Sequence, residues 1–173
     1  MSQIALQQTL EQQRAKRAWS CVRQCLENAV ECLEYAIREA NGKTAKRDRR
    51  QKEALQKRCH QLRTSEEERL SWRKKYGSLA RRLPMLVLTN GLGQTLAFLK
   101  AKGKDDPADE HTILLKQLSA WVLSQVAPGT QEHDLLAWVL QKDTVAYRRA
   151  TLEALAFLAW LKRFAEAEIP SED

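Results

Sequence analysis

The spacing of apolar residues in the first forty positions predicts one long amphipathic helix. Apolar side chains recur every three or four positions, which places them on one stripe of an α-helix. No proline or glycine interrupts residues 3–40, and Gly42 follows as a residue suited to a left-handed helix end. The stripe consists of Ala18, Val22, Cys25, Ala29, Leu33, Ala36 and Ala40.

A second helical stretch is predicted over residues 44–82. Its apolar spacing is interrupted near the point where Ser65 and Glu68 form the pattern of a capping box at a helix start. The stretch is therefore either one helix or two helices with a break. Since only a short turn around residues 41–43 separates it from the first helix, we expect the two to form a long antiparallel hairpin.

Shorter helices are predicted in the rest of the chain. No part of the sequence shows the alternating pattern of a β-strand over a useful length. Pro84 suits a first helical position, and Thr130 and Asp143 are candidate helix caps. A polar linker, "KGKDDPADE", is the clearest change in composition. We therefore expect an all-α fold, one helical domain of residues 1–173 in which the hairpin packs with a bundle of shorter helices. The predicted shorter helices span 84–90, 93–103, 106–126, 131–141 and 143–168.

Charge is distributed unevenly along the 173 residues. Residues 1–104 hold 23 Lys and Arg against 10 Asp and Glu, a net charge of +13, whereas residues 105–173 hold 6 against 12, a net charge of −6. A strongly basic region indicates a polyanion partner, and nucleic acid is the common one. The acidic part is more suited to assembly, with Trp121, Trp138 and Trp160 as possible interface anchors.

The four cysteines do not follow the spacing of a zinc site. Cys21, Cys25 and Cys32 lie on one stripe of the first predicted helix, and Cys59 with His60 makes a weak second half. Buried thiols in a reducing compartment explain them better. We expect no metal and no cofactor.

The segment "NGLGQT" at residues 90–95 resembles a phosphate-binding loop only superficially. Gln94 stands where a Walker loop requires lysine, and no strand precedes the glycines. A turn between two helices, with glycines in conformations that other residues avoid, is the better interpretation. His60, His111 and His133 lack a spaced set of partners, so we expect no enzymatic activity.

Two further features bear on location and on binding. The longest apolar run, "ALAFLAWL", is far too short to span a bilayer, and the polar amino terminus shows no signal peptide. We therefore expect a cytoplasmic protein with no membrane association. Trp72 and Tyr76 lie among basic residues, so this pair is the most plausible place for aromatic contact with nucleic acid.

Three stretches resemble the small subunit of the type III-B CRISPR effector, the Cmr complex. They are "YGSLARRLPMLVLTNGLGQTLAFLKAKGK" at 76–104, "LEQQRAKRAWSCV" at 10–22 and "DTVAYRRATLEALAFLAWLKRFAEAE" at 143–168. Residues 41–68 look longer and more basic than the corresponding link of the family. The resemblance implies an all-α, non-catalytic antiviral defence subunit. Its copies would stack on one another as an inner filament beside the subunits that hold the guide RNA, where they help to bind target RNA.

Sequence recognition would then belong to base pairing, and the protein would contact the backbone of the CRISPR guide RNA and the target RNA. The alternative is a helical adaptor whose basic face binds an acidic protein. The candidate RNA-binding residues are Arg14, Arg17, Lys74, Lys75, Arg81, Arg82, Lys100, Lys102, Arg148, Arg149, Lys162 and Arg163. Of these, Lys100 and Lys102 also suit a helix end, and Lys162 and Arg163 could pair with Glu166.

Overall fold

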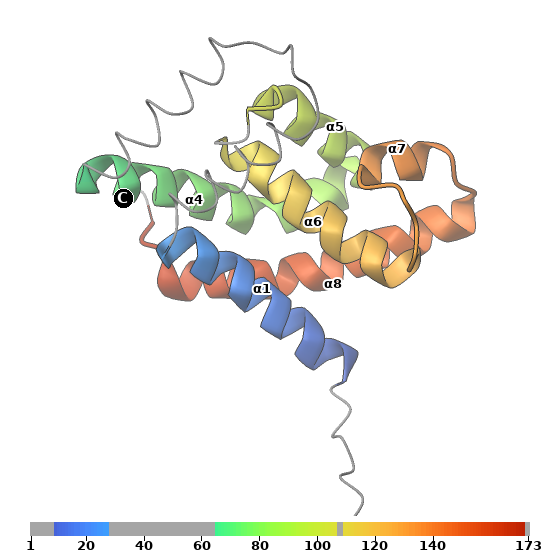
Figure 1. The fold of residues 1–173 in the computed structure, drawn as a ribbon, viewed down its shortest axis with the longest axis horizontal. Coiled ribbons are helices and arrows are strands. Elements are labelled where there is room, and N and C mark those ends of the chain that lie inside the picture. Colours follow the sequence, from blue (N-terminus) through green and yellow to red (C-terminus); the bar gives the residue numbers. More distant parts are fainter. Residues whose placement is uncertain (1–8, 28–64, 107–108, 172–173) are drawn as a thin grey trace, which may run out of the picture.

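The computed structural model describes residues 9–27, 65–106 and 109–171. In these ranges every regular element is a helix (Figure 1), which confirms the all-α prediction. The helices are α1 (Leu10–Glu27), α4 (Glu66–Asn90), α5 (Leu92–Gly103), α6 (Glu110–Val126), α7 (Leu135–Leu140) and α8 (Thr144–Glu168).

Helix α4 begins where the capping signal predicts and continues further than expected. The backbone N–H of Glu68 donates to Oγ of Ser65 at 3.3 Å, so Ser65 is the N-cap. The prediction that Pro84 begins a separate helix is wrong, because Pro84 lies inside α4. Leu83 and Val87 are buried on either side of the proline, so packing of both turns against the core keeps the helix continuous although one hydrogen bond is lost.

The "NGLGQT" segment forms the predicted turn between two helices. Gly91 has φ of +83°, a conformation that favours glycine, and it both ends α4 and precedes α5. The backbone N–H of Gly93 donates to the hydroxyl of Tyr147 at 2.9 Å, which ties the turn to the start of α8.

Aspartate side chains cap the three helices of the acidic part. Asp143 caps α8 as predicted, since its carboxylate accepts from the N–H of Ala146 at 2.8 Å. The other two predicted starts are too early: α6 is capped by Asp109, and α7 by Asp134 rather than by Thr130. Helix α7 is therefore shorter than predicted, because it begins only after Asp134, whose carboxylate accepts from the N–H groups of Leu136 and Ala137.

Helix α8 is the central element of the packing. It contacts α4 and α1 most extensively and α6 next, and Figure 1 shows α1 crossing it diagonally. Gly77 in the middle of α4 lies against Ile169 just after the end of α8, and Gly93 just beyond the end of α4 lies against Tyr147 near the start of α8, so α4 and α8 run antiparallel. Buried apolar residues from all six of these helices form one core cluster.

The proposed hairpin is not established by the structure, because residues 28–64 lie outside the described residues. Cys32, Cys59 and the predicted end at Gly42 also lie there. Within the described part, α1 packs chiefly on α8 and contacts α4 much less. The side chains of Cys21 and Cys25 are buried, as predicted. Among the described helices, none has the length and apolar character needed to cross a bilayer.

Candidate nucleic-acid interface

Helix α4 has one buried face and one exposed face along most of its length. The buried face is formed by Trp72, Tyr76, Leu79, Leu83 and Val87, which follow one another every three or four residues. The same spacing on the opposite side gives a row of mostly exposed residues, which we call the α4 stripe. The α4 stripe consists of Ser71, Lys75, Ser78, Arg82, Met85 and Thr89.

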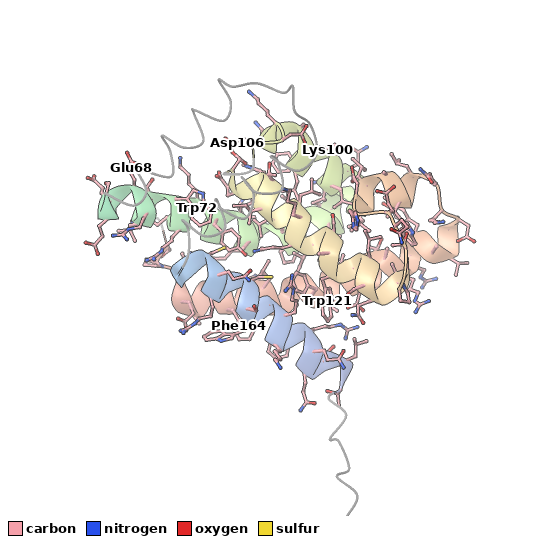
Figure 2. The ribbon with its side chains drawn as sticks, in the orientation of Figure 1. Glu68, Trp72, Lys100, Asp106, Trp121 and Phe164 are labelled. Atoms are coloured by element: carbon pink, nitrogen blue, oxygen red, sulfur yellow. The ribbon has the colours of Figure 1, made fainter. Side chains whose placement is uncertain are left out.

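The prediction that Trp72 and Tyr76 could contact nucleic acid is wrong. Both side chains are buried and stack on each other, with ring centroids 6.0 Å apart. Figure 2 labels Trp72 on α4. The hydroxyl of Tyr76 donates to Oε1 of Gln117 on α6 at 2.8 Å. The pair therefore anchors α4 in the core and orients the α4 stripe toward solvent.

Lys75 and Arg82 carry the charge of the α4 stripe. Both are exposed, and neither forms an ion pair in the part of the chain that the structure describes. They are seven positions apart in the sequence, so they lie about 10 Å apart along one side of the helix. The first turn of α4, with Glu66, Glu67 and Glu68, bounds the basic region on one side. The α4 stripe therefore carries its positive charge from Lys75 onward.

Arg81 has a structural role beside the α4 stripe. Its Nη2 donates to the carbonyl oxygens of Ile169 at 3.1 Å and Pro170 at 3.2 Å. The side chain of Ile169 is buried against Gly77, where an added Cβ would lie 2.7 Å from its Cγ2. Arg81 thus holds the segment that follows α8 against α4, whereas the neighbouring Arg82 projects away from it.

Arg14 is another predicted RNA-binding residue with partners inside the protein. Its side chain is only 14% exposed, and it pairs with Glu153 of α8 as well as with Glu11. The hydrogen bond to Glu153 is the main cause that raises the pKa of Arg14 above its ordinary value, although burial opposes the shift. A phosphate could bind Arg14 only by competing with two carboxylates.

Lys100, Lys162 and Arg163 also have acidic neighbours. Lys100 Nζ lies 2.6 Å from Oδ2 of Asp134, and this hydrogen bond raises the pKa of Lys100. Glu166 lies 3.7 Å from Lys162 and 3.6 Å from Arg163, the pairing that the sequence suggested. The remaining five candidates form no ion pair among the described residues. Arg17 and Lys74 are partly exposed, and Lys102, Arg148 and Arg149 are exposed.

The twelve candidates are distributed over several helices. They occur on α1, α4, α5 and α8, and the described structure leaves Lys75 and Arg82 as a pair with a common direction. In the α4 stripe the hydroxyl of Thr89 donates to the carbonyl oxygen of Met85 at 2.9 Å, whereas Ser71 and Ser78 offer hydroxyl groups of a kind that commonly contacts phosphate. Sequence reasoning did not single out these residues. Their alternating spacing of three and four, opposite the buried face, was the available signal.

The histidine with acidic neighbours is explained by helix capping. Ligand atoms of Asp109, Glu110 and His111 lie within 4.8 Å of one another. However, Asp109 already accepts from the backbone N–H of His111 at 2.8 Å and lies 2.8 Å from its ring Nδ1. This arrangement satisfies the first turn of α6 and does not by itself indicate a metal.

Comparison with known proteins identifies the family. A family model described as CRISPR-associated protein (Cas_Cmr5) matches residues 46–168, which is more than half of the chain. The chain belongs to this family. A protein of Thermus thermophilus described as CRISPR system Cmr subunit Cmr5 is 36% identical over 97 residues, which cover 56% of this chain and 77% of the relative.

Membership of the Cmr5 family confirms the resemblance to the small subunit of the type III-B Cmr complex. The matched region contains the α4 stripe, the glycine turn and α8. It also includes most of residues 41–68, which we expected to depart from the family, whereas residues 10–22 lie outside it. The resemblance of that opening segment therefore stays a prediction.

Proposed function

We propose that this protein is a non-catalytic architectural subunit of a type III-B Cmr complex, located in the cytoplasm, that holds RNA through the α4 stripe. Copies of the subunit would stack beside the proteins that carry the guide RNA, and their stripes together would contact the backbone of the guide–target duplex or of the target strand. Cleavage would belong to other subunits. Membership of the Cmr5 family supports the assignment to the complex.

The observation that carries the RNA-binding role is the division of α4 into two faces. Its apolar face is fully used in the core, and the opposite face presents Lys75 and Arg82 without carboxylate partners among the described residues. Contacts of this kind neutralise phosphates and carry no base information. Binding by one free subunit should therefore be weak and independent of sequence, and several copies side by side would add their contacts.

The test is a salt titration of target-RNA binding with Lys75→Glu/Arg82→Glu. We expect similar loss of affinity for unrelated RNA sequences and a salt dependence flatter by about one unit of slope for each lost phosphate contact. Lys104→Glu/Lys142→Glu is the matched control, since it makes the same change in net charge at two exposed positions away from the stripe. Equal losses in both double variants would show a general charge effect and would contradict the proposal.

The same experiment addresses the alternative of an adaptor for an acidic protein. Polyglutamate offers negative charge without the spacing of a phosphate backbone. If it competed with RNA as well as an unrelated RNA does, the α4 stripe would be a binding site for acidic polypeptides. Arg81 is left unchanged in these variants, because its contacts with Ile169 and Pro170 would mix loss of binding with loss of structure.

A further inference from the structure

Three aromatic rings and one guanidinium form a continuous series at the contact between α1 and α8. The Trp160 ring stacks on Phe164, with centroids 5.7 Å apart and planes 24° apart. Phe164 meets Trp19 of α1 edge to face at 5.1 Å, and the Arg23 guanidinium lies 5.6 Å from the Trp19 centroid. We call these four residues the aromatic ladder; Figure 2 labels Phe164 where α1 crosses α8.

The rings of the aromatic ladder reach the surface. Trp19, Phe164 and Trp160 are all partly exposed, and Arg23 is exposed. The other three tryptophans are core residues, with exposed fractions of 3% for Trp72, 8% for Trp121 and 7% for Trp138. Trp19 and Trp160 are thus the two tryptophans whose rings a ligand could touch.

The docking of α1 on α8 has other supports beside the aromatic ladder. Ala18, Cys21, Val22 and Cys25 of α1 are completely buried. The ion pair between Arg14 and Glu153 joins the same two helices. The aromatic rings therefore add partly exposed aromatic surface next to a contact that is already packed and paired.

Positive charge accompanies the rings. Lys16, Trp19 and Arg23 follow one another at spacings of three and four, so they share one side of α1. Lys16 is exposed and has no ion-pair partner among the described residues. Rings flanked by cations along a line are the arrangement with which proteins hold single strands: bases stack on the rings, and phosphates meet the cations.

We propose that the aromatic ladder stacks unpaired bases of single-stranded nucleic acid. The proposal rests on the RNA-binding function above and adds a second contact that senses bases rather than phosphates. The indole N–H of Trp160 already donates to Oε2 of Glu11 at 2.9 Å, so this ring offers no hydrogen bond for reading a base. Stacking should therefore tolerate any base and should persist at salt concentrations that weaken phosphate contacts.

The test compares the full chain bound to a mixed-sequence single-stranded DNA 20-mer and to an abasic 20-mer with the same phosphates. We expect the wild-type protein to prefer the base-containing strand by about tenfold, and this ratio to persist as salt rises. Trp19→Leu and Phe164→Leu should each bring the ratio toward one. Leucine keeps an apolar side chain at the contact of α1 with α8. Because both strands are measured with the same protein sample, the ratio of their affinities does not depend on the fraction of the sample that is folded.

Three controls separate the possible outcomes. Lys75→Glu/Arg82→Glu should lower affinity for both strands and leave the ratio unchanged, because it removes phosphate contacts only. Trp19→Leu should bind single-stranded RNA of the same sequence more weakly than the wild-type protein does, as it should for DNA. A loss of affinity for only one of the two nucleic acids would contradict stacking on bases. If Trp19→Leu fails to fold, the wild-type protein is cross-linked to a strand that contains 5-iodouracil. The proposal then requires that the cross-linked peptides include those that contain Trp19 or Phe164.

A ratio near one in the wild-type protein would contradict base stacking on the aromatic ladder and would leave the proposal for the α4 stripe unaffected. A ratio that persists in both leucine variants, or cross-links confined to other peptides, would also overturn it. Absence of binding to either strand would remove the proposed function as well. If Trp19→Leu lowered incorporation into the Cmr complex without changing the ratio, the rings would form a protein contact and the proposal would be wrong.

Discussion

Arg14 of α1 and Glu153 of α8 form a bidentate ion pair between positions 139 residues apart in the sequence. Arg14 Nε donates to Oε1 of Glu153 at 2.9 Å, and Nη2 donates to Oε2 at 2.6 Å. The indole N–H of Trp121 on α6 donates to the same carboxylate at 2.8 Å. Glu153 therefore joins three helices, and its charge is buried with partners rather than alone.

Replacing Arg14 by methionine should destabilise the protein by about 3 kcal/mol, because a buried carboxylate would lose its cation. Arg17→Met is the matched control: Arg17 lies on the same helix without a carboxylate partner among the described residues, so its loss should change the free energy of unfolding by less than about 0.5 kcal/mol. Urea denaturation followed by circular dichroism measures both. Equal effects would show that the ion pair contributes nothing to the docking of α1.

The double variant Arg14→Met/Glu153→Met sharpens this prediction. Removing both charges leaves no buried unpaired ion, and apolar side chains of similar length can fill the space. The double variant should therefore be more stable than Arg14→Met alone. A double variant that is less stable than either single variant would contradict the role assigned to the pair.

Acid should weaken the fold through Glu153. The hydrogen bond from Arg14 is the main cause that holds the pKa of Glu153 below its ordinary 4.5, although burial opposes the shift. A carboxyl with a lowered folded-state pKa contributes stability above 4.5 and loses it as pH falls through the folded-state pKa. The difference in unfolding free energy between wild type and Glu153→Gln should thus be largest above about pH 5 and shrink in acid.

Glu153→Gln should reduce the acid sensitivity without abolishing it. For Asp134, burial alone would raise the pKa, but the hydrogen bonds from Lys100 and from backbone N–H groups outweigh it and lower the pKa. In the Glu153→Gln variant, protonation of Asp134 in acid would still remove the contribution of this second carboxyl to the free energy of unfolding. Urea denaturation at several pH values between 2 and 7 checks the prediction, and parallel curves for both proteins would refute it.

The sequence was sufficient for those features that depend on local contacts. The N-caps Ser65 and Asp143 and the stop at Gly91 were predicted because a cap and the N–H groups it serves are close neighbours in the chain. Pro84 was misplaced because burial of the flanking turns, a tertiary effect, overrides its local preference. The cap at Asp134 was missed because Thr130 and Asp134 both lie near the start of α7, and either residue type can cap a helix.

The sequence does not reveal partners that lie far apart along the chain. Nothing near Arg14 indicates that Glu153 will meet it, so a buried arginine and a phosphate-binding one look alike. Arg81 and Arg82 are adjacent, yet only Arg81 reaches the carbonyl groups of the segment after α8. The exposed charge of Lys75 and Arg82 became distinguishable only when the buried face of α4 was known.

Gly77→Ala should destabilise the protein by about 1–2 kcal/mol, although alanine is the better helix former. An added Cβ would lie 2.7 Å from Cγ2 and 3.1 Å from Cβ of Ile169, so the buried isoleucine would have to leave its position. In an Ile169→Ala background the 2.7 Å contact with Cγ2 is removed while the 3.1 Å contact with the Cβ of residue 169 remains, so Gly77→Ala should cost clearly less than in the wild-type protein. Thermal or urea unfolding of the four proteins measures the coupling. A similar loss in both backgrounds would exclude the steric explanation.

The acidic part should serve assembly through exposed apolar residues rather than through Trp121 and Trp138, two of the three tryptophans first considered. Trp121 and Trp138 are core residues, 8% and 7% exposed, whereas Val145 and Leu152 of α8 are 78% and 60% exposed. Seven residues separate Val145 from Leu152, so they share one side of α8. Large exposed apolar side chains in such a row are typical of a protein contact.

Val145→Gln/Leu152→Gln should therefore reduce incorporation of the subunit into a reconstituted Cmr complex. Because both side chains are exposed, the free energy of unfolding should change by less than about 0.5 kcal/mol per residue. Leu10→Gln is the control, since Leu10 of α1 is also exposed, at 41%, and lies on another helix. Co-purification with the other subunits measures incorporation, and urea denaturation verifies the fold. Normal incorporation of the α8 variant, or an equal defect in Leu10→Gln, would mean that this side of α8 is not the assembly surface.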